Sequence, residues 1–460
     1  MILGKKSGID MCEGPLTGKL WRFTVPLILM NALQLLYTAA DMVIVGRYEG
    51  DAAVAAVGAA SPLVSLIVNV FIGFSIGVNV CVGNLIGAKR QNDEKKAIDT
   101  AAILGIVSGI IVIVLGVAFT GPLLAVMDTP IEIFEATKLY AIVYFFGSPA
   151  NLLYNFLAAV LRARGDTGRP LYILTACGVL NVLLNVVFVA GLGLGVLGVA
   201  VATVISQYAS AIIIVTMIRR ESEALVLRGL KIHKESFLKM IKLGLPSGIQ
   251  GSVFSLSTMV IQSAINSFDT AAVAGNTAAS NIDTFSYIAF NAFQTTAVAF
   301  IAQNCGAKKI ERVRSSFRLC MLFAVIVAMI TGWCIYLFSQ PLLGVYLPGE
   351  ADAIAFGSIR MKFICIPYFI LAMMDVTVGA LRGLGSSLLP TVISVIGSCG
   401  TRILWIFTAF ERNPTPETLY FSFPLAWAVT FFALLVAYFF VLRKRTREFE
   451  ALPENLSQSC

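Results

Sequence analysis

The chain has 460 residues, of which 58% are hydrophobic and only 13% are charged. An average soluble domain is about 25% charged, so this composition excludes the soluble globular class and predicts a membrane protein that crosses the bilayer many times. The formal net charge is +8. In a soluble protein this excess would suggest nucleic-acid binding. Here the positions of the basic residues explain the charge, and we expect no nucleic-acid partner.

Twelve apolar segments, each long enough to span a bilayer, follow one another along the chain. They cover residues 20–45, 53–82, 97–120, 134–160, 170–190, 194–218, 241–266, 271–302, 319–340, 354–380, 390–410 and 417–441. Most of the 34 Lys and Arg residues lie at the two termini or after every second span. The positive-inside rule therefore places both termini in the cytoplasm. We predict an all-α, multi-pass protein of the plasma membrane (the inner membrane of a bacterial cell), a monomer surrounded by lipids.

The chain repeats itself at an offset of about 220 residues. The matching pairs are Pro26 with Pro246, Gly87-Ala-Lys-Arg90 with Gly306-Ala-Lys-Lys309, Leu161-Arg162 with Leu381-Arg382, and Pro170 with Pro390. The predicted domains are an N-terminal segment (1–19), an N-lobe of six spans (20–218), a cytoplasmic linker (219–240), a C-lobe of six spans (241–441) and a cytoplasmic tail (442–460). Two parallel six-span repeats are typical of secondary transporters, which bind substrate near the midplane where the repeats meet.

The first span carries a polar stripe. On a helix, Asn31, Gln34, Thr38 and Asp41 share one face, and Tyr37 lies beside them. An ionised Asp near the bilayer centre costs at least ~2.5–3.5 kcal/mol, so such a residue normally faces the protein interior or a water-filled cavity. We therefore interpret Asp41 as a functional residue and the stripe as the lining of a cavity.

Several motifs together resemble the multidrug and toxic compound extrusion (MATE) family over nearly the whole chain. They are Pro26…Gln34…Tyr37…Asp41…Arg47, the loop Leu161–Pro170, Asn181…Asn185, Gly198…Thr203…Gln207, Gln303–Ala307 and Leu381–Gly385. The resemblance implies twelve helices in two six-helix lobes that form a V-shaped cavity. It also implies export of small organic, often cationic, compounds in exchange for H⁺ or Na⁺, by alternating access.

The resemblance also implies a coupling site. In some bacterial members an Asp in the first helix, here Asp41, lies beside an Asn, an Asp and a Thr. The second helix-5 position here is Asn185 in place of Asp, which removes a negative charge and weakens the case for Na⁺. Other branches use acids in helices 7 and 10. The predicted coupling residues are Asp41, Asn181, Asn185, Thr203 and Asp375, and the predicted substrate-cavity residues are Asn31, Gln34, Tyr37, Gln250 and Asp283.

A carboxylic acid buried in an apolar cavity holds its proton more tightly than one in water, so Asp41 or Asp375 could exchange protons near neutral pH. The choice between H⁺ and Na⁺, and between the two lobes, stays open. Structural roles also stay open: Asp283 could form an ion pair with Arg402, and Asn181 and Asn185 could bond neighbouring helices. A lipid-linked precursor flippase is the alternative function, although it predicts a more basic cavity than these spans provide.

Other catalytic and binding chemistries lack the residues that they need. His233 is the single histidine, and the nine cysteines show no CxxC or metal-ligand spacing. Walker A and HExxH motifs are also missing. We expect no metal centre, no cofactor and no enzymatic activity. Gly73…Gly77 has the spacing of a close helix contact, and Gly193…Gly198 is interpreted as a turn with close packing in place of a nucleotide site.

Overall fold

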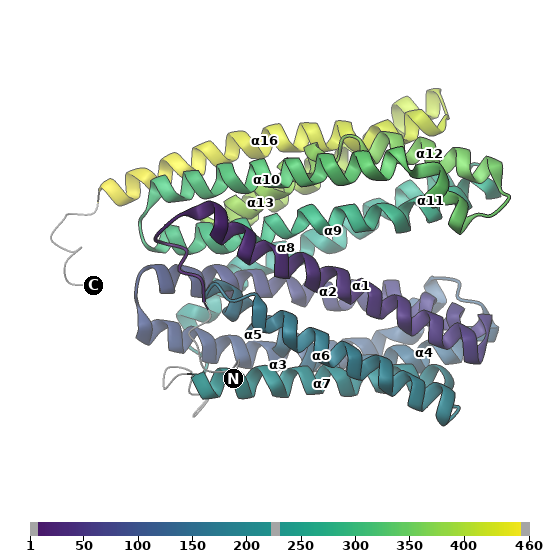
Figure 1. The fold of residues 1–460 in the computed structure, drawn as a ribbon, viewed down its shortest axis with the longest axis horizontal. Helices are drawn as coiled ribbons and strands as arrows, with labels where there is room; N and C mark the ends of the chain where they lie inside the picture. Colours follow the sequence, from purple (N-terminus) through teal and green to yellow (C-terminus); the bar gives the residue numbers. More distant parts are fainter. Residues whose placement is uncertain (1–7, 222–230, 452–460) are drawn as a thin grey trace. The chain divides into compact units, whose positions relative to one another are not determined.

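The computed structural model describes residues 8–221 and 231–451, and every regular element within these ranges is a helix (Figure 1). The predicted all-α fold class is therefore confirmed. Residues 1–7, 222–230 and 452–460 lie outside the described part. Parts of the predicted N-terminal segment, linker and cytoplasmic tail fall on these residues.

The chain divides into two compact units. Two of the boundaries between them, after Thr24 and after Gly248, fall inside helices. The first unit holds Met1–Asp10 and Val25–Gly248, and the second holds Met11–Thr24 and Ile249–Cys460. The boundaries therefore interrupt α1 (Leu16–Glu49) and α8 (Lys234–Ile265), which contain Pro26 and Pro246 in their interiors. A proline removes one backbone hydrogen bond from a helix interior. Each helix thus passes from one unit to the other close to its weakest point.

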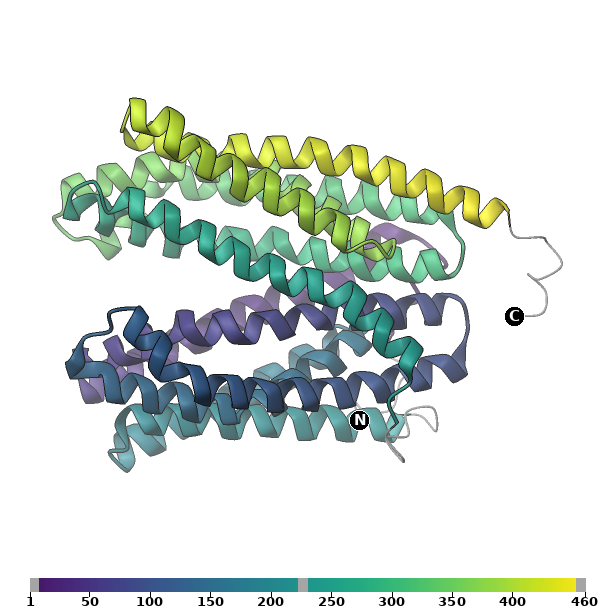
Figure 2. The ribbon, with the colours of Figure 1, turned by 180° about the vertical axis from the view of Figure 1, so that it is seen from behind.

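The helices of the first unit follow one another with short connections (Figure 1, Figure 2). They are α2 (Asp51–Gly87), α3 (Gln91–Val126), α4 (Ile131–Phe146), α5 (Ser148–Ala163), α6 (Gly168–Asn185), the π-helical segment η1 (Val186–Gly191) and α7 (Gly195–Glu221). Helix α2 packs against α3, α4 and α5, and α7 packs against α4, α5 and α6. Side chains from these helices form one continuous apolar core.

Glycines allow α2 and the start of α8 to approach closely. A Cβ atom on Gly73 would collide with the backbone of Gly248, and one on Gly77 would collide with the carbonyl of Met240 and the backbone of Gly244. The predicted packing role of Gly73…Gly77 is therefore what the structure shows.

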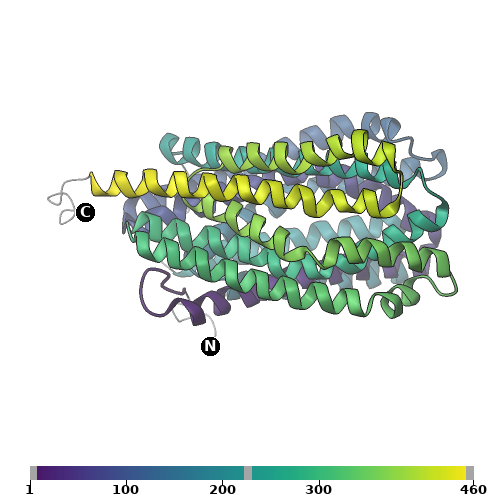
Figure 3. The ribbon, with the colours of Figure 1, turned by 90° about the horizontal axis from the view of Figure 1, so that it is seen from above.

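The second unit contains the remaining helices (Figure 3), with α16 drawn in yellow. They are α9 (Thr270–Gly306), α10 (Ile310–Leu337), α11 (Ser339–Tyr346), α12 (Ala351–Cys365), α13 (Tyr368–Gly383), α14 (Leu388–Ser394), η2 (Val395–Gly400), α15 (Thr401–Trp405), η3 (Ile406–Phe410) and α16 (Pro416–Glu450). Helix α9 begins at a capping side chain, because Asp269 Oδ1 accepts a hydrogen bond from the Ala272 amide at 2.8 Å.

Residues 11–15, just before α1, belong to the second unit, and basic side chains of that unit bind the backbone of this segment. The Arg312 guanidinium donates to the carbonyls of Met11, Glu13 and Gly14 at 3.0, 2.7 and 2.8 Å. Lys309 donates to the Cys12 carbonyl at 2.9 Å. These charge-assisted bonds satisfy carbonyls that no helix or sheet uses.

The two repeats share local backbone geometry. Lys89 and Lys308 both have a positive φ, of 58° and 55°, at the matching turns after α2 and α9. Gly165 and Gly385 have φ values of 84° and 83° at the matching turns after α5 and α13. Such left-handed conformations are uncommon outside glycine, so their recurrence at the same offset supports the predicted repeat.

Within the described residues, nine helices are individually long and apolar enough to cross a membrane, and the bent pair α12 and α13, with an angle of 46°, raises the number to ten. All twelve predicted spans lie on helices. Two predicted spans are not among these ten. Segment 134–160 is divided between α4 and α5 by the break at Gly147, and segment 241–266 lies in α8, which contains Ser and Gln residues. Helix α10 starts at Ile310, nine residues before the predicted apolar span. Its first turns contain charged residues, and a search for apolar segments does not include them.

Candidate substrate and coupling site

The first unit contains an open cavity of about 460 Å³, a size that suits a drug-sized molecule. Its lining comes from α1, α2, α4, α5, α6 and α7. The predicted residues that line it are Asn31, Gln34, Tyr37, Asp41, Asn181 and Thr203. The polar stripe of the first span therefore faces a cavity, in agreement with the interpretation of its helical periodicity.

Three helices meet at Asp41 through a chain of hydrogen bonds. The Asn185 amide, fully buried on α6, donates to Asp41 Oδ1 on α1. The same amide nitrogen lies 3.4 Å from Asn181 Oδ1, and Asn181 Nδ2 donates to Thr203 Oγ1 on α7 at 3.3 Å. Asn185 does not line the cavity; it supports the carboxylate from behind. The structure thus brings four of the five predicted coupling residues together.

Tyr37 fixes the position of α1 against α6 beside this network. Its hydroxyl donates to the Thr175 carbonyl at 3.2 Å, and its ring occupies the space that a Cβ on Gly178 would need. Only glycine permits this close approach of ring and helix. Just beyond the network, α6 changes to the π-helical segment η1 directly after Asn185, a type of irregularity that is frequent at functional sites.

The cavity contains two charged side chains, Asp41 and Arg162, among its lining residues. The remaining polar lining is neutral, so these two charges dominate the electrostatics of the cavity. In the described part of the chain, no group of three or more His, Cys, Asp or Glu side chains could hold a metal ion.

Several cavity residues were not predicted as site residues. They are Tyr140, Tyr144, Asn151, Tyr154, Asn155, Arg162, Ser206, Gln207 and Ser210. The sequence contains a signal for some of them, because Tyr140 and Tyr144, Asn151 and Asn155, and Ser206 and Ser210 are spaced four residues apart. Such pairs share one face of a helix, and a search for polar i, i+4 pairs in apolar spans would have found them.

Asp375 and Gln250 lie in the second unit and do not line this cavity. Asp375 Oδ2, on α13, accepts a hydrogen bond from Asn291 Nδ2 at 3.0 Å. Gln250 Oε1 accepts hydrogen bonds from Arg382 Nη2 at 3.0 Å and from Thr391 Oγ1 at 3.2 Å. The structure therefore places these two predicted residues in hydrogen-bonded groups of the second unit, outside the cavity.

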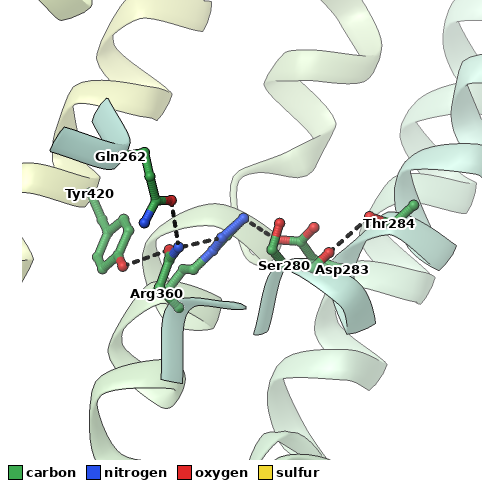
Figure 4. Close-up of polar contacts among 7 residues, drawn as sticks. Gln262, Ser280, Asp283, Thr284, Arg360 and Tyr420 are labelled. Atoms are coloured by element: carbon green, nitrogen blue, oxygen red, sulfur yellow. Dashed lines mark hydrogen bonds and ion pairs between the residues drawn. The ribbon is translucent and has the colours of Figure 1, made fainter. Parts of the chain in front are cut away.

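Asp283 belongs to a second buried cluster in the same unit. Figure 4 shows the Arg360 side chain between Tyr420 and Asp283. Arg360 Nη2 lies 2.7 Å from Asp283 Oδ2, and Nη1 lies 3.4 Å from Asn276 Oδ1, which also accepts from the Tyr420 hydroxyl at 2.9 Å. This arrangement is that of an internal ion pair joining α9, α12 and α16.

The suggested ion pair between Asp283 and Arg402 is wrong. Asp283 pairs with Arg360, which extends from α12 toward α9. The Arg402 guanidinium instead lies over the Phe423 ring, 4.3 Å from its centroid, and 5.9 Å from the centroid of Trp427. Stacking on aromatic rings stabilises a buried cation without a carboxylate. The positions of the apolar segments in the sequence do not show which of these partners Arg402 contacts.

Many membrane-length helices around a polar, drug-sized cavity define a membrane transporter of small molecules. The MatE family model matches residues 26–187 and, a second time, residues 246–408. The chain therefore belongs to the MATE family, a family of multi-pass membrane transporters. The double match also confirms the internal repeat.

Individual relatives agree with this assignment. The chain is 28% identical to the probable multidrug resistance protein YoeA of Bacillus subtilis, covering 92% of this chain and 95% of the relative. It is 26% identical to the probable multidrug resistance protein NorM of Thermotoga maritima, covering 84% of each. A structure of the Vibrio cholerae MATE transporter VcmN has the same fold, with a TM-score of 0.86 at 21% identity over 93% of this chain and 97% of that one.

Proposed function

We propose that this protein exports small organic, often cationic, compounds across the plasma membrane in exchange for protons, by alternating access. The observation that carries the proposal is Asp41, the single acidic side chain lining the cavity, held by Asn185 on a neighbouring helix. The multidrug names of the relatives support the substrate class. The clustering of basic residues supports cytoplasmic termini.

The proposed exchange uses two protonation states of one carboxyl group. Ionised Asp41 attracts a cationic substrate, and the amide of Asn185 stabilises that state by donating a hydrogen bond. Protonation of Asp41 neutralises the cavity wall and releases the cation. A proton that moves inward along the membrane potential supplies ~2.3 kcal/mol per 100 mV. Because either ligand occupies the same carboxylate, the two cannot bind together, which is the condition for exchange.

The residues at the site favour protons over sodium as the coupling ion. Na⁺ is a hard cation and favours several oxygen ligands with negative charge, whereas a proton needs one titratable group. Asn185 stands at the position of the second acid and provides no charge, and the remaining partners, Asn181 and Thr203, are neutral. The flippase alternative is not favoured, because the cavity has a single basic side chain, Arg162, among its lining residues.

The test uses purified protein in liposomes loaded with a fluorescent organic cation. A pH gradient and a sodium gradient are imposed separately on wild type, Asp41→Asn and Asp51→Asn, where Asp51 is an exposed acid in the first turn of α2. We expect the pH gradient to drive efflux in wild type and Asp51→Asn, and Asp41→Asn to abolish it. Sodium-driven efflux that survives Asp41→Asn would contradict the proposal and direct attention to Asp375.

A further inference from the structure

Arg162 is a half-buried cation with no carboxylate partner among the described residues. It lies near the end of α5 and lines the cavity of the first unit. Its Nε is buried and has no hydrogen-bond partner, and no ion pair to Arg162 occurs among the described residues. A guanidinium keeps its charge under all physiological conditions. The free energy of removing its Nε from water is therefore not recovered by a hydrogen bond or an ion pair inside the protein.

The second repeat contains an equivalent arginine in different surroundings. Arg382 occupies the position equivalent to Arg162. Its Nη2 donates to Gln250 Oε1 at 3.0 Å, and Asp375 lies seven residues before it on the same helix, α13. In that unit one guanidinium nitrogen thus has a neutral acceptor, while the Nε of Arg382, like that of Arg162, has no hydrogen-bond partner.

The first repeat lacks the equivalents of Gln250 and Asp375. At the offset of about 220 residues, Met30 replaces Gln250 and Asn155 replaces Asp375. Both replacements line the cavity, yet neither forms a hydrogen bond with Arg162. Asn155 Nδ2 donates to the carbonyl and side chain of Asn151 instead. The counter-charge is thus missing on the side of Arg162 that faces open space.

The missing counter-charge fits an anionic group of a bound molecule. Carboxylates and phosphonates match the forked donors of a guanidinium, and such charge-assisted pairs are stronger than neutral hydrogen bonds. The opposite charge in the cavity, Asp41, is well separated. Met30 and Asp41 both line the cavity from α1, and eleven residues of helix span roughly 16 Å. The register of the repeat places Met30 at the Arg162 end.

We propose that Arg162 is an anion-binding residue, and that the preferred substrates are elongated zwitterions with a cation beside Asp41 and a carboxylate or phosphonate beside Arg162. This inference rests on the proposed function, because it names the substrate class of the same cavity. It differs from that proposal in requiring a second, negative group on the substrate. The neutral Asn155 is then a specificity-determining residue, since an acid there would neutralise Arg162 internally.

The test measures binding with a matched pair of dansyl probes. One has a quaternary ammonium group at one end and a carboxylate at the other, and the second is its methyl ester. Both are titrated against full-length protein in nanodiscs, as wild type, Arg162→Gln and the exposed control Arg47→Gln. We expect wild type and Arg47→Gln to bind the carboxylate about tenfold more tightly than the ester, and Arg162→Gln to lose this preference. Equal preference in wild type and Arg162→Gln would overturn the assignment.

A second variant keeps the test valid if Arg162→Gln fails to fold. Asn155→Asp restores the acid that the second repeat contains, and we expect it to remove the carboxylate preference while Arg162 remains in place. Retention of the preference would contradict the inference. The same titrations are repeated with inorganic phosphate present. If wild type still prefers the carboxylate probe to the ester, the anion at Arg162 belongs to the substrate. If phosphate eliminates this preference, the site binds a free anion.

The outcome is separable from that of the proposed function. Efflux of the ester probe under a pH gradient tests export and the role of Asp41, since the ester has no anionic group. Ester efflux without a carboxylate preference would overturn the role of Arg162 alone. A carboxylate preference in the binding assay without efflux of either probe would support Arg162 and reject proton-driven export.

Discussion

The Asp283–Arg360 pair shows how strongly a single buried residue depends on its partner. Both side chains are about as enclosed as core residues, with exposed fractions of 7% and 10%, and their charged atoms lie 2.7 Å apart. In such a pair the attraction mainly offsets the free energy of removing two ions from water. Loss of one partner is therefore more damaging than loss of both.

We expect Asp283→Asn to lower the free energy of unfolding by roughly 3–5 kcal/mol, because it leaves the Arg360 charge buried and uncompensated. The double variant Asp283→Asn/Arg360→Met removes both charges and should recover much of that loss. Unfolding by denaturant in detergent micelles, followed by tryptophan fluorescence, measures the difference. A double variant that is less stable than Asp283→Asn alone would show that the pair acts through something other than charge.

At the scale of single residues, the sequence predicts which residues are functional candidates better than it predicts which side chains contact one another. Asp41 could be singled out because a carboxylate in a membrane-length helix is costly wherever it is not enclosed by protein. The partners of Arg402 and the isolation of Arg162 could not be predicted, because each depends on which neighbouring helices present their side chains to it. The repeat, however, identifies Arg162 and Arg382 as equivalent, and their different surroundings then become informative.

Among the elements, α2 and α8 depend on close backbone contact. The small residues Gly73 and Gly77 let the first half of α8 pack against α2 within the first unit. Without a hydrophobic driving force between helices in lipid, such small-residue contacts and the van der Waals packing that they allow are a main source of helix association.

We expect Gly73→Ala to destabilise the protein by about 1–3 kcal/mol, because the new methyl group would overlap the backbone of Gly248 and the helices would have to separate. Gly251→Ala on α8 is the matched control, since a Cβ there meets nothing within 4 Å. The control should be neutral or slightly stabilising. Thermal unfolding of the two purified variants distinguishes them, and equal stability would disprove the importance of the contact.

The elements themselves were predictable to within several residues, with two informative exceptions. The break between α4 and α5 at Gly147 lies inside one continuous apolar segment, so hydropathy alone does not detect it. The π-helical segments η1 and η3 begin at Val186 and Ile406, which are corresponding positions of the two repeats.

Across the whole molecule, the repeat was the most reliable prediction, because matching motifs recur in order and the positions of the turns depend on glycine and basic residues that are visible in the sequence. The division into two compact units was harder to predict from the sequence. The sequence places the change of lobe in a polar linker, whereas α1 and α8 each contribute residues to both units. Long helices that contain a proline can belong to two packing units without any change in their composition.

The central claim is that one carboxyl group, Asp41, carries either a proton or a cationic substrate. If so, binding of substrate must displace the proton from the fraction of molecules that hold it. The most direct measurement is proton release when an organic cation is added to purified protein in weakly buffered solution, at a pH below the midpoint of Asp41 titration. We expect wild type to release about one proton per cation bound and Asp41→Asn to release none. Equal release from both would contradict the account.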